Sequence, residues 1–274
     1  MFAGISTVLF AAVVIIPFIY GLYLTFTSWD GISKDKQFVG FANYIATFKD
    51  IAYWQALGRT VIYSVISVVL VNVVAFFLAY LLTSGIKGQN FFRAGFFIPN
   101  LIGGIVLGYI WQTLLNGLLS KWGQPLLALS AKNGFIGMLI LLCWQQIGYM
   151  MIIYIAGLQN VPDDLIEAAE IDGAAKWDIL WKIRVPMVMS SITICVFLTL
   201  TNSFKLFDQN LALTGGDPNH ATEMLALNIY QTFYARAGMQ WKGYGQAKAV
   251  IFCALVIIIS LVQLKATRSK EVQQ

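Results

Sequence analysis

The feature that most restricts the fold of this chain is a series of six apolar runs, each long enough to cross a lipid bilayer. A hydrocarbon core of about 30 Å needs about 20 helical residues at about 1.5 Å each. Backbone groups in lipid must pair within the structure, so each run is predicted to be a helix. We therefore predict an all-α membrane protein with six transmembrane helices. The runs cover roughly residues 3–26, 61–82, 94–115, 135–158, 187–207 and 244–264.

The composition agrees with a membrane location. Of 274 residues, 58% are hydrophobic and only 11% are charged, whereas soluble domains carry about 25% charged residues. The first run lacks a basic segment before it and is too long for a signal peptide, so we interpret it as a membrane helix. Basic residues beside membrane spans account for the net charge of +5, so no nucleic acid is expected as a partner.

Metal chemistry is not expected. Cys143, Cys195 and Cys253 lie inside apolar runs without a CxxC spacing, and the single histidine, His220, lies in a polar loop. The chain also lacks a phosphate-binding GxxxxGK[ST] loop and paired carboxylates within a span, so it is not expected to be an enzyme. We expect no cofactor and no metal ligand.

The orientation in the membrane is less clear from charge. Six spans put both termini on the same side, and the loops on the two sides carry eight Lys or Arg each. The inner loops 83–93, 159–186 and 265–274 are shorter, and their higher density of positive charge favours cytoplasmic termini. Lys205 and Lys248 lie near outer span ends, where snorkelling toward the surface is expected.

A charged segment, residues 159–186, separates the fourth and fifth runs and ends directly in the next apolar run. Pro162 and the two aspartates after it predict a helix start. Asp172-Gly173 predicts its end. A second short helix is expected over 174–183, and Pro186 is expected to open the next span. The segment is either a folded docking element or an amphipathic loop lying on the headgroups.

The spacing within this segment is specific. Glu167-Ala168-Ala169 is followed by Gly173, Ile183 and Val185-Pro186. This pattern resembles the EAA loop of binding-protein-dependent ABC importers with every spacing kept; Val185 stands where the family has Leu. The resemblance implies that Glu167, Ala168, Ala169, Asp172, Gly173 and Trp177 form a helical element that docks into a groove of an ATPase subunit.

Three other stretches resemble the sugar-permease branch of that family. Residues 38–44 look like its outer-loop signature, residues 92–99 like the start of its third span, and residues 214–218 like the Thr-x-Gly-Gly-Pro turn after the fifth span, with Asp217 inserted. The chain thus resembles the permeases of maltose, raffinose and glycerol-phosphate importers. The resemblance implies the transmembrane domain of a type I ABC importer.

The resemblance implies that the protein is a permease, which moves a carbohydrate across a bacterial inner membrane. The expected cargo is an oligosaccharide. The resemblance also implies a second related permease subunit, two ATP-binding subunits that bind the ATP, and an extracytoplasmic sugar-binding protein. Three segments are expected: 1–56, the first helix and outer loop; 57–264, the transmembrane core with the coupling loop 159–186; and 265–274, a cytoplasmic tail. Lipid surrounds the spans.

Polar groups within the spans suggest a substrate path, because such groups are costly in lipid and tend to face a cavity or another helix. Aromatic faces and amides suit sugars, and Trp144, Gln146, Tyr149, Asn202 and Ser203 offer both in the fourth and fifth runs. Counted from the EAA-like loop, Tyr149 coincides with a sugar-contacting tyrosine of the maltose permease. Hydrogen bonding between helices is the alternative for these residues.

Two alternative functions stay open. The same class of transporter could carry glycerol phosphate or an acidic sugar, against which the absence of an Arg deep in any span argues. A membrane scaffold or receptor could bind an ATPase without transporting anything. A scaffold would not need polar side chains in the middle of its spans.

Overall fold

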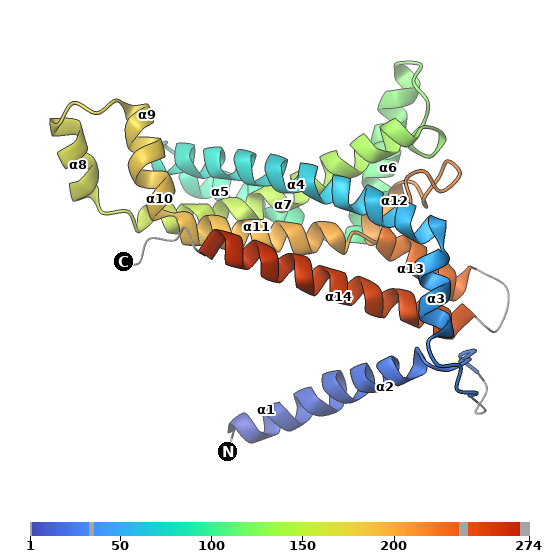
Figure 1. Ribbon diagram of the computed structural model, residues 1–274. Coiled ribbons are helices and arrows are strands. Elements are labelled where there is room, and N and C mark those ends of the chain that lie inside the picture. Colours follow the sequence, from blue (N-terminus) through green and yellow to red (C-terminus); the bar gives the residue numbers. More distant parts are fainter. Residues whose placement is uncertain (1, 33–35, 236–240, 269–274) are drawn as a thin grey trace. The chain divides into compact units, whose positions relative to one another are not determined.

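The computed structural model describes residues 2–32, 36–235 and 241–268, and this part of the chain is almost entirely helical (Figure 1). Within these ranges it contains no β-strand, and Thr27 and Phe38 form an isolated bridge. Four helices can cross a membrane, and two bent helix pairs bring the number of spans to six when each pair counts as one. The predicted all-α membrane fold is confirmed. The four helices are Gly4–Leu24, Ile51–Thr83, Ala131–Gln159 and Lys242–Arg268.

The third span is not one straight helix. Gln89–Leu101 and Gly104–Lys121 meet at an angle of 102°. Pro99 lies in a short 3₁₀ turn, Ile98–Leu101, and the next residue, Ile102, is extended with φ −92° and ψ 133°. Proline lacks the N–H that would continue the helical hydrogen bonds, so the helix ends there and restarts in a new direction.

The fifth span is also bent, by 71° between Lys176–Met187 and Met189–Phe204. Pro186 was expected to open this span, but it lies within the preceding helical stretch, and the bend falls at Val188, with φ −94° and ψ 16°. The proline ring is tolerated in the first turn of a helical segment, where its missing N–H costs nothing. The chain therefore turns just after Pro186.

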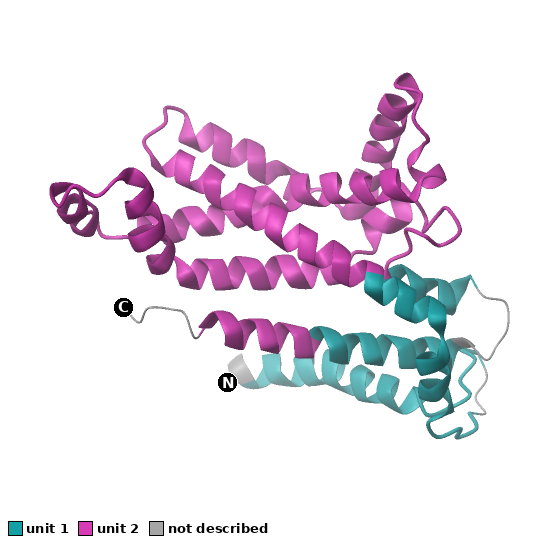
Figure 2. Cartoon of the chain, turned by 45° about the horizontal axis from the view of Figure 1, so that its top comes forward, with its two compact units in different colours: residues 1–58, 225–256 teal, residues 59–224, 257–274 magenta. Residues whose placement is uncertain are grey.

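The chain forms two compact units, coloured separately in Figure 2, and the first consists of residues 1–58 and 225–256. Its small core joins the start of α4 to α13, through Tyr53, Ala56, Leu225 and Ile229. Most described side chains of the first long helix are exposed as far as Tyr20, which suits a lipid or protein environment. The elements are α1 (Phe2–Phe10), the π-helical η1 (Ala11–Ile15), α2 (Ile16–Leu24), α3 (Ala42–Lys49), the beginning of α4 (Ile51–Thr83), α13 (Leu225–Tyr234) and most of α14 (Trp241–Arg268).

The second unit, residues 59–224 and 257–274, is built around α7 (Ala131–Gln159), which packs against α5, α11 and α12. Its core has two clusters, one around Tyr154 and Met150 and one around Tyr63 and Met138. Its other elements are the rest of α4, α5 (Gln89–Phe97), η2 (Ile98–Leu101), α6 (Gly104–Lys121), η3 (Leu127–Leu129), α8 (Asp163–Ile171), α9 (Lys176–Ile179), the π-helical η4 (Leu180–Arg184), α10 (Val185–Met187), α11 (Met189–Phe204), α12 (Asp208–Leu213) and the end of α14.

The contact between α5 and α7 depends on Gly148. A Cβ atom at this position would lie 1.8 Å from the carbonyl oxygen of Phe96, well inside any allowed distance. The backbones therefore approach closely only because residue 148 has no side chain. This approach fixes the first half of the bent third span against α7.

The snorkelling expected for Lys248 is wrong. The side chain is fully buried and its ammonium lies 2.7 Å from the carboxylate of Asp50. A buried cation is stable only when it is paired and hydrogen-bonded, and Asp50, α13 and two tyrosine rings supply that environment.

Candidate functional site

The coupling segment, residues 159–186, folds as two short helical stretches at one end of unit 2, away from α12 (Figure 1). The first, α8, begins after the extended Pro162, with Asp163 and Asp164 in its first turn, where carboxylates favour the positive end of the helix dipole. This is the helix start that the sequence predicts. It lies on the same unit as α7 and α11.

Gly173 ends α8 as expected. Its φ is 80°, in the left-handed region that favours glycine. The N–H of Ala174 donates to the carbonyl of Ala169 at 2.9 Å, and the N–H of Gly173 to that of Glu170 at 3.1 Å. These bonds satisfy carbonyls that the helix end would leave unpaired. The turn directs the chain back toward unit 2.

One side of the coupling segment packs on the membrane helices of unit 2. Ile166 contacts the cluster around Tyr154, and Leu180, which belongs to that cluster, is buried, as is the neighbouring Ile179. The second stretch, expected over 174–183, runs from α9 through α10. The segment is therefore a folded element attached to the spans.

The other side of the segment presents exposed apolar and acidic side chains. Ile171 is 86% exposed and Trp177 62% exposed, and the ring of Trp177 packs only edge-on with Trp181. Glu167 and Ala168 are exposed beside them and Ala169 is half-buried. The segment carries six acidic and three basic side chains. Large exposed apolar side chains beside charges are typical of protein-binding surfaces.

A polar pocket of about 260 Å³ lies between the starts of α6 and α12, the middle of α7 and the end of α11. The side-chain amide of Asn202 donates to Oε1 of Gln146 across it at 3.1 Å. Gln209 donates to Gln145 at 2.7 Å. Its lining residues are Gly104, Leu142, Gln145, Gln146, Asn202, Lys205, Leu206, Phe207, Asp208 and Gln209.

The structure brings two of the five predicted path residues to this pocket, Gln146 and Asn202. Trp144 lies at a ring distance of 5.3 Å from Trp111. Tyr149 is half-buried with its ring 6.5 Å from that of Phe97, and Ser203 is buried and donates to the carbonyl of Thr199. These three are not among the pocket's lining residues.

Four polar lining residues were not predicted: Gln145, Lys205, Asp208 and Gln209. Gln145 could have been found as the neighbour of Gln146 in the same polar pair. Asp208 and Gln209 follow the fifth span, where the sequence predicts only an outer loop. Only the short helix α12, folded back along α6, brings them to the pocket.

Interhelical hydrogen bonding also occurs in this unit. Tyr154 donates to Asn72 at 2.8 Å, and Asn72 donates to Thr199 at 3.3 Å, so α4, α7 and α11 are joined by buried polar groups. None of these three residues lines the pocket. Interhelical hydrogen bonding was the alternative for the predicted path residues, and Gln146 and Asn202 also form such a bond, between α7 and α11.

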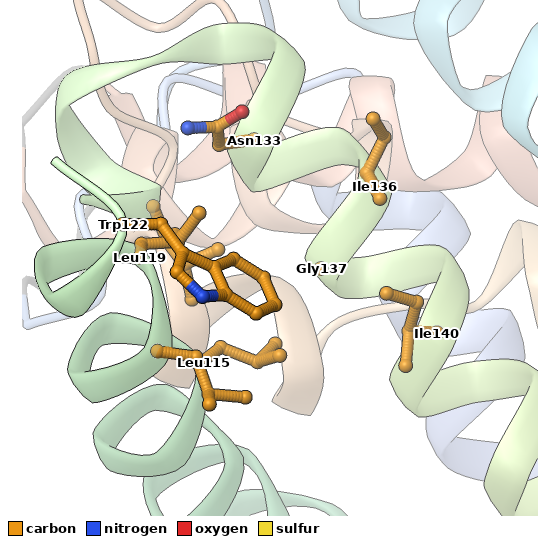
Figure 3. A pocket seen from close by; sticks show the side chains of 9 residues that line it. Leu115, Leu119, Trp122, Asn133, Ile136, Gly137 and Ile140 are labelled. Atoms are coloured by element: carbon orange, nitrogen blue, oxygen red, sulfur yellow. The ribbon is translucent and has the colours of Figure 1, made fainter. Parts of the chain in front are cut away.

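A second pocket of about 200 Å³, between α6 and α7, is lined mostly by apolar side chains (Figure 3). Trp122 covers one side of it, with Leu115 and Leu119 below and Ile136 and Ile140 opposite (Figure 3). Asn133 is its one polar lining side chain. Such a lining offers little hydrogen bonding to a hydroxylated cargo, so the polar pocket is the candidate path.

Comparison with known proteins gives a consistent result. Residues 72–268 match the family described as "Binding-protein-dependent transport system inner membrane component". The chain is 42% identical over 269 residues to "Probable starch degradation products transport system permease protein AmyD" of Thermoanaerobacterium thermosulfurigenes, covering 95% of this chain and 90% of the relative. It is 32% identical to the "Multiple sugar-binding transport system permease protein MsmF" of Streptococcus mutans, covering 93% and 90%.

A further relative is the "sn-glycerol-3-phosphate transport system permease protein UgpA" of Rhizobium meliloti, 30% identical and covering 91% of this chain and 87% of the relative. Among solved structures, one chain of a bacterial ABC transporter involved in the import of the acidic polysaccharide alginate aligns with a TM-score of 0.79. It covers 96% of this chain and 92% of its own length. At 17% identity this likeness speaks for the fold alone.

Proposed function

Because the chain belongs to the family of binding-protein-dependent transport system inner membrane components, we propose that it is the permease subunit of an ATP-driven ABC importer that carries a carbohydrate across the cell membrane. The family is one of multi-pass transport proteins, and the helices described above are long and apolar enough for that role. The names of the relatives concern starch degradation products, multiple sugars and glycerol phosphate. They support a sugar, with an oligosaccharide as the first choice.

The observation that carries the proposal is the exposed face of the coupling segment. Glu167 and Ile171 on α8 and Trp177 on α9 are exposed to solvent, while the other side of the segment packs on the spans. Exposed apolar groups of this size in an acidic setting call for a partner with an apolar groove and basic rim. In this proposal the partner is an ATPase subunit, and the ATP is bound there.

The complete importer contains two such ATPase subunits, a second related permease and an extracytoplasmic sugar-binding protein. The family description, "Binding-protein-dependent transport system inner membrane component", supports a binding protein as one of these partners. In this proposal both termini are cytoplasmic. ATP-driven approach of the coupling segments would then move the spans as rigid bodies and open the path alternately to each side.

The polar pocket is the candidate substrate path. Gln146 lies near the middle of α7, where an unmet amide would be costly in lipid. Its bond to Asn202 leaves donors and acceptors that can exchange partners with sugar hydroxyls. The scaffold alternative gives no reason for a polar pocket between the membrane helices.

The experiment that tests the function measures uptake and assembly together. A panel of labelled maltotriose, raffinose and sn-glycerol-3-phosphate is offered to cells with and without the gene. Glu167→Lys and Trp177→Ala are expected to reduce co-purification of the ATPase and uptake in parallel, because both remove contacts of the exposed face. Glu170→Gln serves as a control that removes one charge. Unchanged co-purification of the ATPase in both variants would contradict a docking role for the exposed face of the coupling segment.

A second test addresses the pocket. Asn202→Ala is expected to lower uptake by up to about tenfold at normal abundance, since one hydrogen bond to cargo is worth about 0.5–1.5 kcal/mol. Tyr149→Ala is the comparison, because Tyr149 does not line the pocket and its loss creates a cavity that costs about 3–5 kcal/mol and lowers abundance. Normal uptake in Asn202→Ala would assign the cargo site to the partner permease.

A second cargo class is favoured by one observation. Lys205 lines the polar pocket, so a cationic group is available beside the amides. A carboxylated sugar or glycerol phosphate would pair with it, although Asp208 on the same pocket opposes a high negative charge. Lys205→Gln should reduce uptake of an anionic cargo selectively and leave neutral maltotriose unaffected.

A further inference from the structure

Unit 1 contains a buried ion pair that lies outside both the polar pocket and the coupling segment. The ammonium of Lys248 is fully buried and lies 2.7 Å from Oδ2 of Asp50. It also donates to Oδ1 of Asn228 at 3.0 Å and to the hydroxyl of Thr232 at 3.1 Å. Three acceptors thus match the three N–H bonds of the ammonium group.

The surroundings of the ammonium are suited to a positive charge. The ring of Tyr244 lies 4.7 Å and the ring of Tyr53 5.7 Å from Nζ, both within the range of a cation–π contact. The hydroxyl of Tyr244 donates to Oδ2 of Asp50 at 2.6 Å. Charge, hydrogen bonds and rings all point to a lysine held as a cation.

Asp50 has a second task in the same place. Its other oxygen, Oδ1, accepts the backbone N–H of Ala52 at 2.9 Å and that of Tyr53 at 3.4 Å. Asp50 therefore caps the N-terminus of α4, where a negative charge also favours the helix dipole. One carboxylate joins the first turn of a 33-residue helix to the cation on α14.

Three helices meet at this cluster, all within unit 1. Asp50 begins α4, Asn228 and Thr232 stand one turn apart on α13, and Lys248 stands on α14. Both α4 and α14 continue as long apolar spans. A side chain that slipped by one turn along either span would leave a buried charge without its partner, which is costly.

We propose that Asp50 and Lys248 are positioning residues that fix the register of α4, α13 and α14 and make these helices move as one body during transport. The proposal rests on the transport function given above. Neither residue is assigned contact with cargo. Their role is to transmit movement between the beginnings of two spans.

The test uses the assembled importer and separates charge from shape. Asp50→Asn keeps the cap of α4 but removes the counter-ion, so it leaves the buried ammonium unpaired. The double variant Asp50→Asn/Lys248→Gln removes both charges and keeps amide donors and acceptors. Replacing a whole buried pair is far less damaging than breaking it. We expect the double variant to recover most of what the single variant loses.

Two quantities are measured. Hydrogen exchange of residues 51–58 and 225–234 should become at least about 100-fold faster in Asp50→Asn, as expected for a broken buried pair, and return toward the wild type in the double variant. The maximal rate of labelled maltotriose uptake per assembled complex should fall at least about tenfold, with KM unchanged. If Asp50→Asn does not accumulate in the membrane, the abundance of the double variant is compared instead. Recovery of that abundance supports the proposal, and its absence contradicts it.

Lys242→Gln is the matched control. Lys242 lies on the same helix, also beside an aromatic ring, Tyr234 at 4.6 Å, but it donates to a backbone carbonyl and is half-buried. Its variant should behave as the wild type. Equal effects of Lys242→Gln and Asp50→Asn, or normal uptake per complex in Asp50→Asn, would overturn the proposal. If wild-type cells take up no maltotriose, the cargo is wrong, whereas the exchange data still judge the ion pair.

Discussion

At the scale of single residues, two glycines occupy positions that a residue with a side chain would fill only at a cost in stability. Gly173 needs a left-handed backbone, with φ at 80°, and Gly148 needs the absence of a Cβ atom beside Phe96. The first constraint belongs to the backbone of the coupling segment and the second to packing in the core of unit 2. They can therefore be separated by substitution.

Gly173→Val should weaken the coupling segment through the backbone alone. Nothing lies within 4 Å of a Cβ atom at this position, so no clash contributes. A non-glycine residue in the left-handed region costs about 1–3 kcal/mol, with β-branched residues at the upper end. We expect reduced ATPase co-purification at near-normal abundance. Gly173→Asn, which tolerates this region, should stay close to wild type, and equal loss in both variants would exclude backbone strain as the cause.

Gly148→Ala should lower the stability of the folded protein, in contrast to Gly173→Val. The added methyl group would meet the backbone of Phe96 at 1.8 Å, so α5 and α7 must separate. Overpacking of this kind costs about 1–3 kcal/mol and occasionally more. Membrane abundance and thermal stability in detergent measure the effect. Gly95→Ala is the control, because nothing lies within 4 Å of a Cβ there; a similar loss at both positions would contradict the packing argument.

At the scale of elements, the connections between helices decide what each helix does. Asp50 caps α4 and pairs with α14, and Gly173 turns α8 back toward the spans. In each case one residue at a helix end sets the direction or register of a much longer element. The coupling segment packs along one side on the cluster around Tyr154, and its turn at Gly173 is hydrogen-bonded, so these contacts fix its position within unit 2.

The cap at Asp50 also predicts a pH dependence. Burial opposes ionisation of Asp50, but the hydrogen bonds and charge of Lys248 and the hydroxyl of Tyr244 outweigh it and hold the pKa of the carboxyl below its ordinary value of 3.8. A lowered pKa in the folded state means that its stabilisation is complete above that ordinary value and is lost as pH falls through the folded one.

The measurement compares thermal stability of the wild type and Asp50→Asn in detergent. The stability difference between them should be constant from about pH 5 to 8 and should shrink below about pH 4, where the carboxyl of Asp50 takes up a proton in the unfolded state before it does so in the folded state. A difference that instead grows on acidification would mean that Asp50 does not pair as an anion.

At the scale of the whole molecule, the two ends of unit 2 differ in kind. The coupling segment lies at one end, and α12 with the loop after it lies at the other (Figure 1). That loop is organised by Asn210, which donates to the carbonyl of Thr222 at 2.9 Å and accepts the N–H of Met224 at 2.9 Å. Opposite ends of a membrane-spanning unit face opposite compartments, so these two surfaces report the orientation.

We expect residues 28–60, 116–134 and 208–243 to face outward. A single cysteine at Asn219, in a background without the three native cysteines, should react with an impermeant maleimide in intact cells, whereas one at Asp178 should react only after permeabilisation. Ser33, a further position for this test, lies outside the described residues. Labelling of Asp178→Cys in intact cells, with Asn219→Cys protected, would invert the topology.

The sequence alone determined the features that depend on local composition. The six apolar runs, the helix start at Pro162 and the turn at Gly173 each follow from residues within one short window. The coupling residues were predicted in the same way, because a fixed spacing in one segment carries their pattern, and their role stays a prediction. Length and periodicity suffice for such features, since lipid allows little besides a helix.

Only the tertiary structure decided the features that depend on distant partners. From the sequence, Lys248 is predicted to snorkel toward the surface. In the structure it pairs with Asp50, which is almost 200 residues earlier in the chain. Gln146 and Asn202 line the same pocket, whereas Tyr149 does not. The rotation of each helix about its axis and the bend near Pro99 decide which side chains line that pocket. An apolar window shows that a helix crosses the membrane. It does not show which face meets which neighbour, because that face is chosen by packing among helices that are remote in sequence.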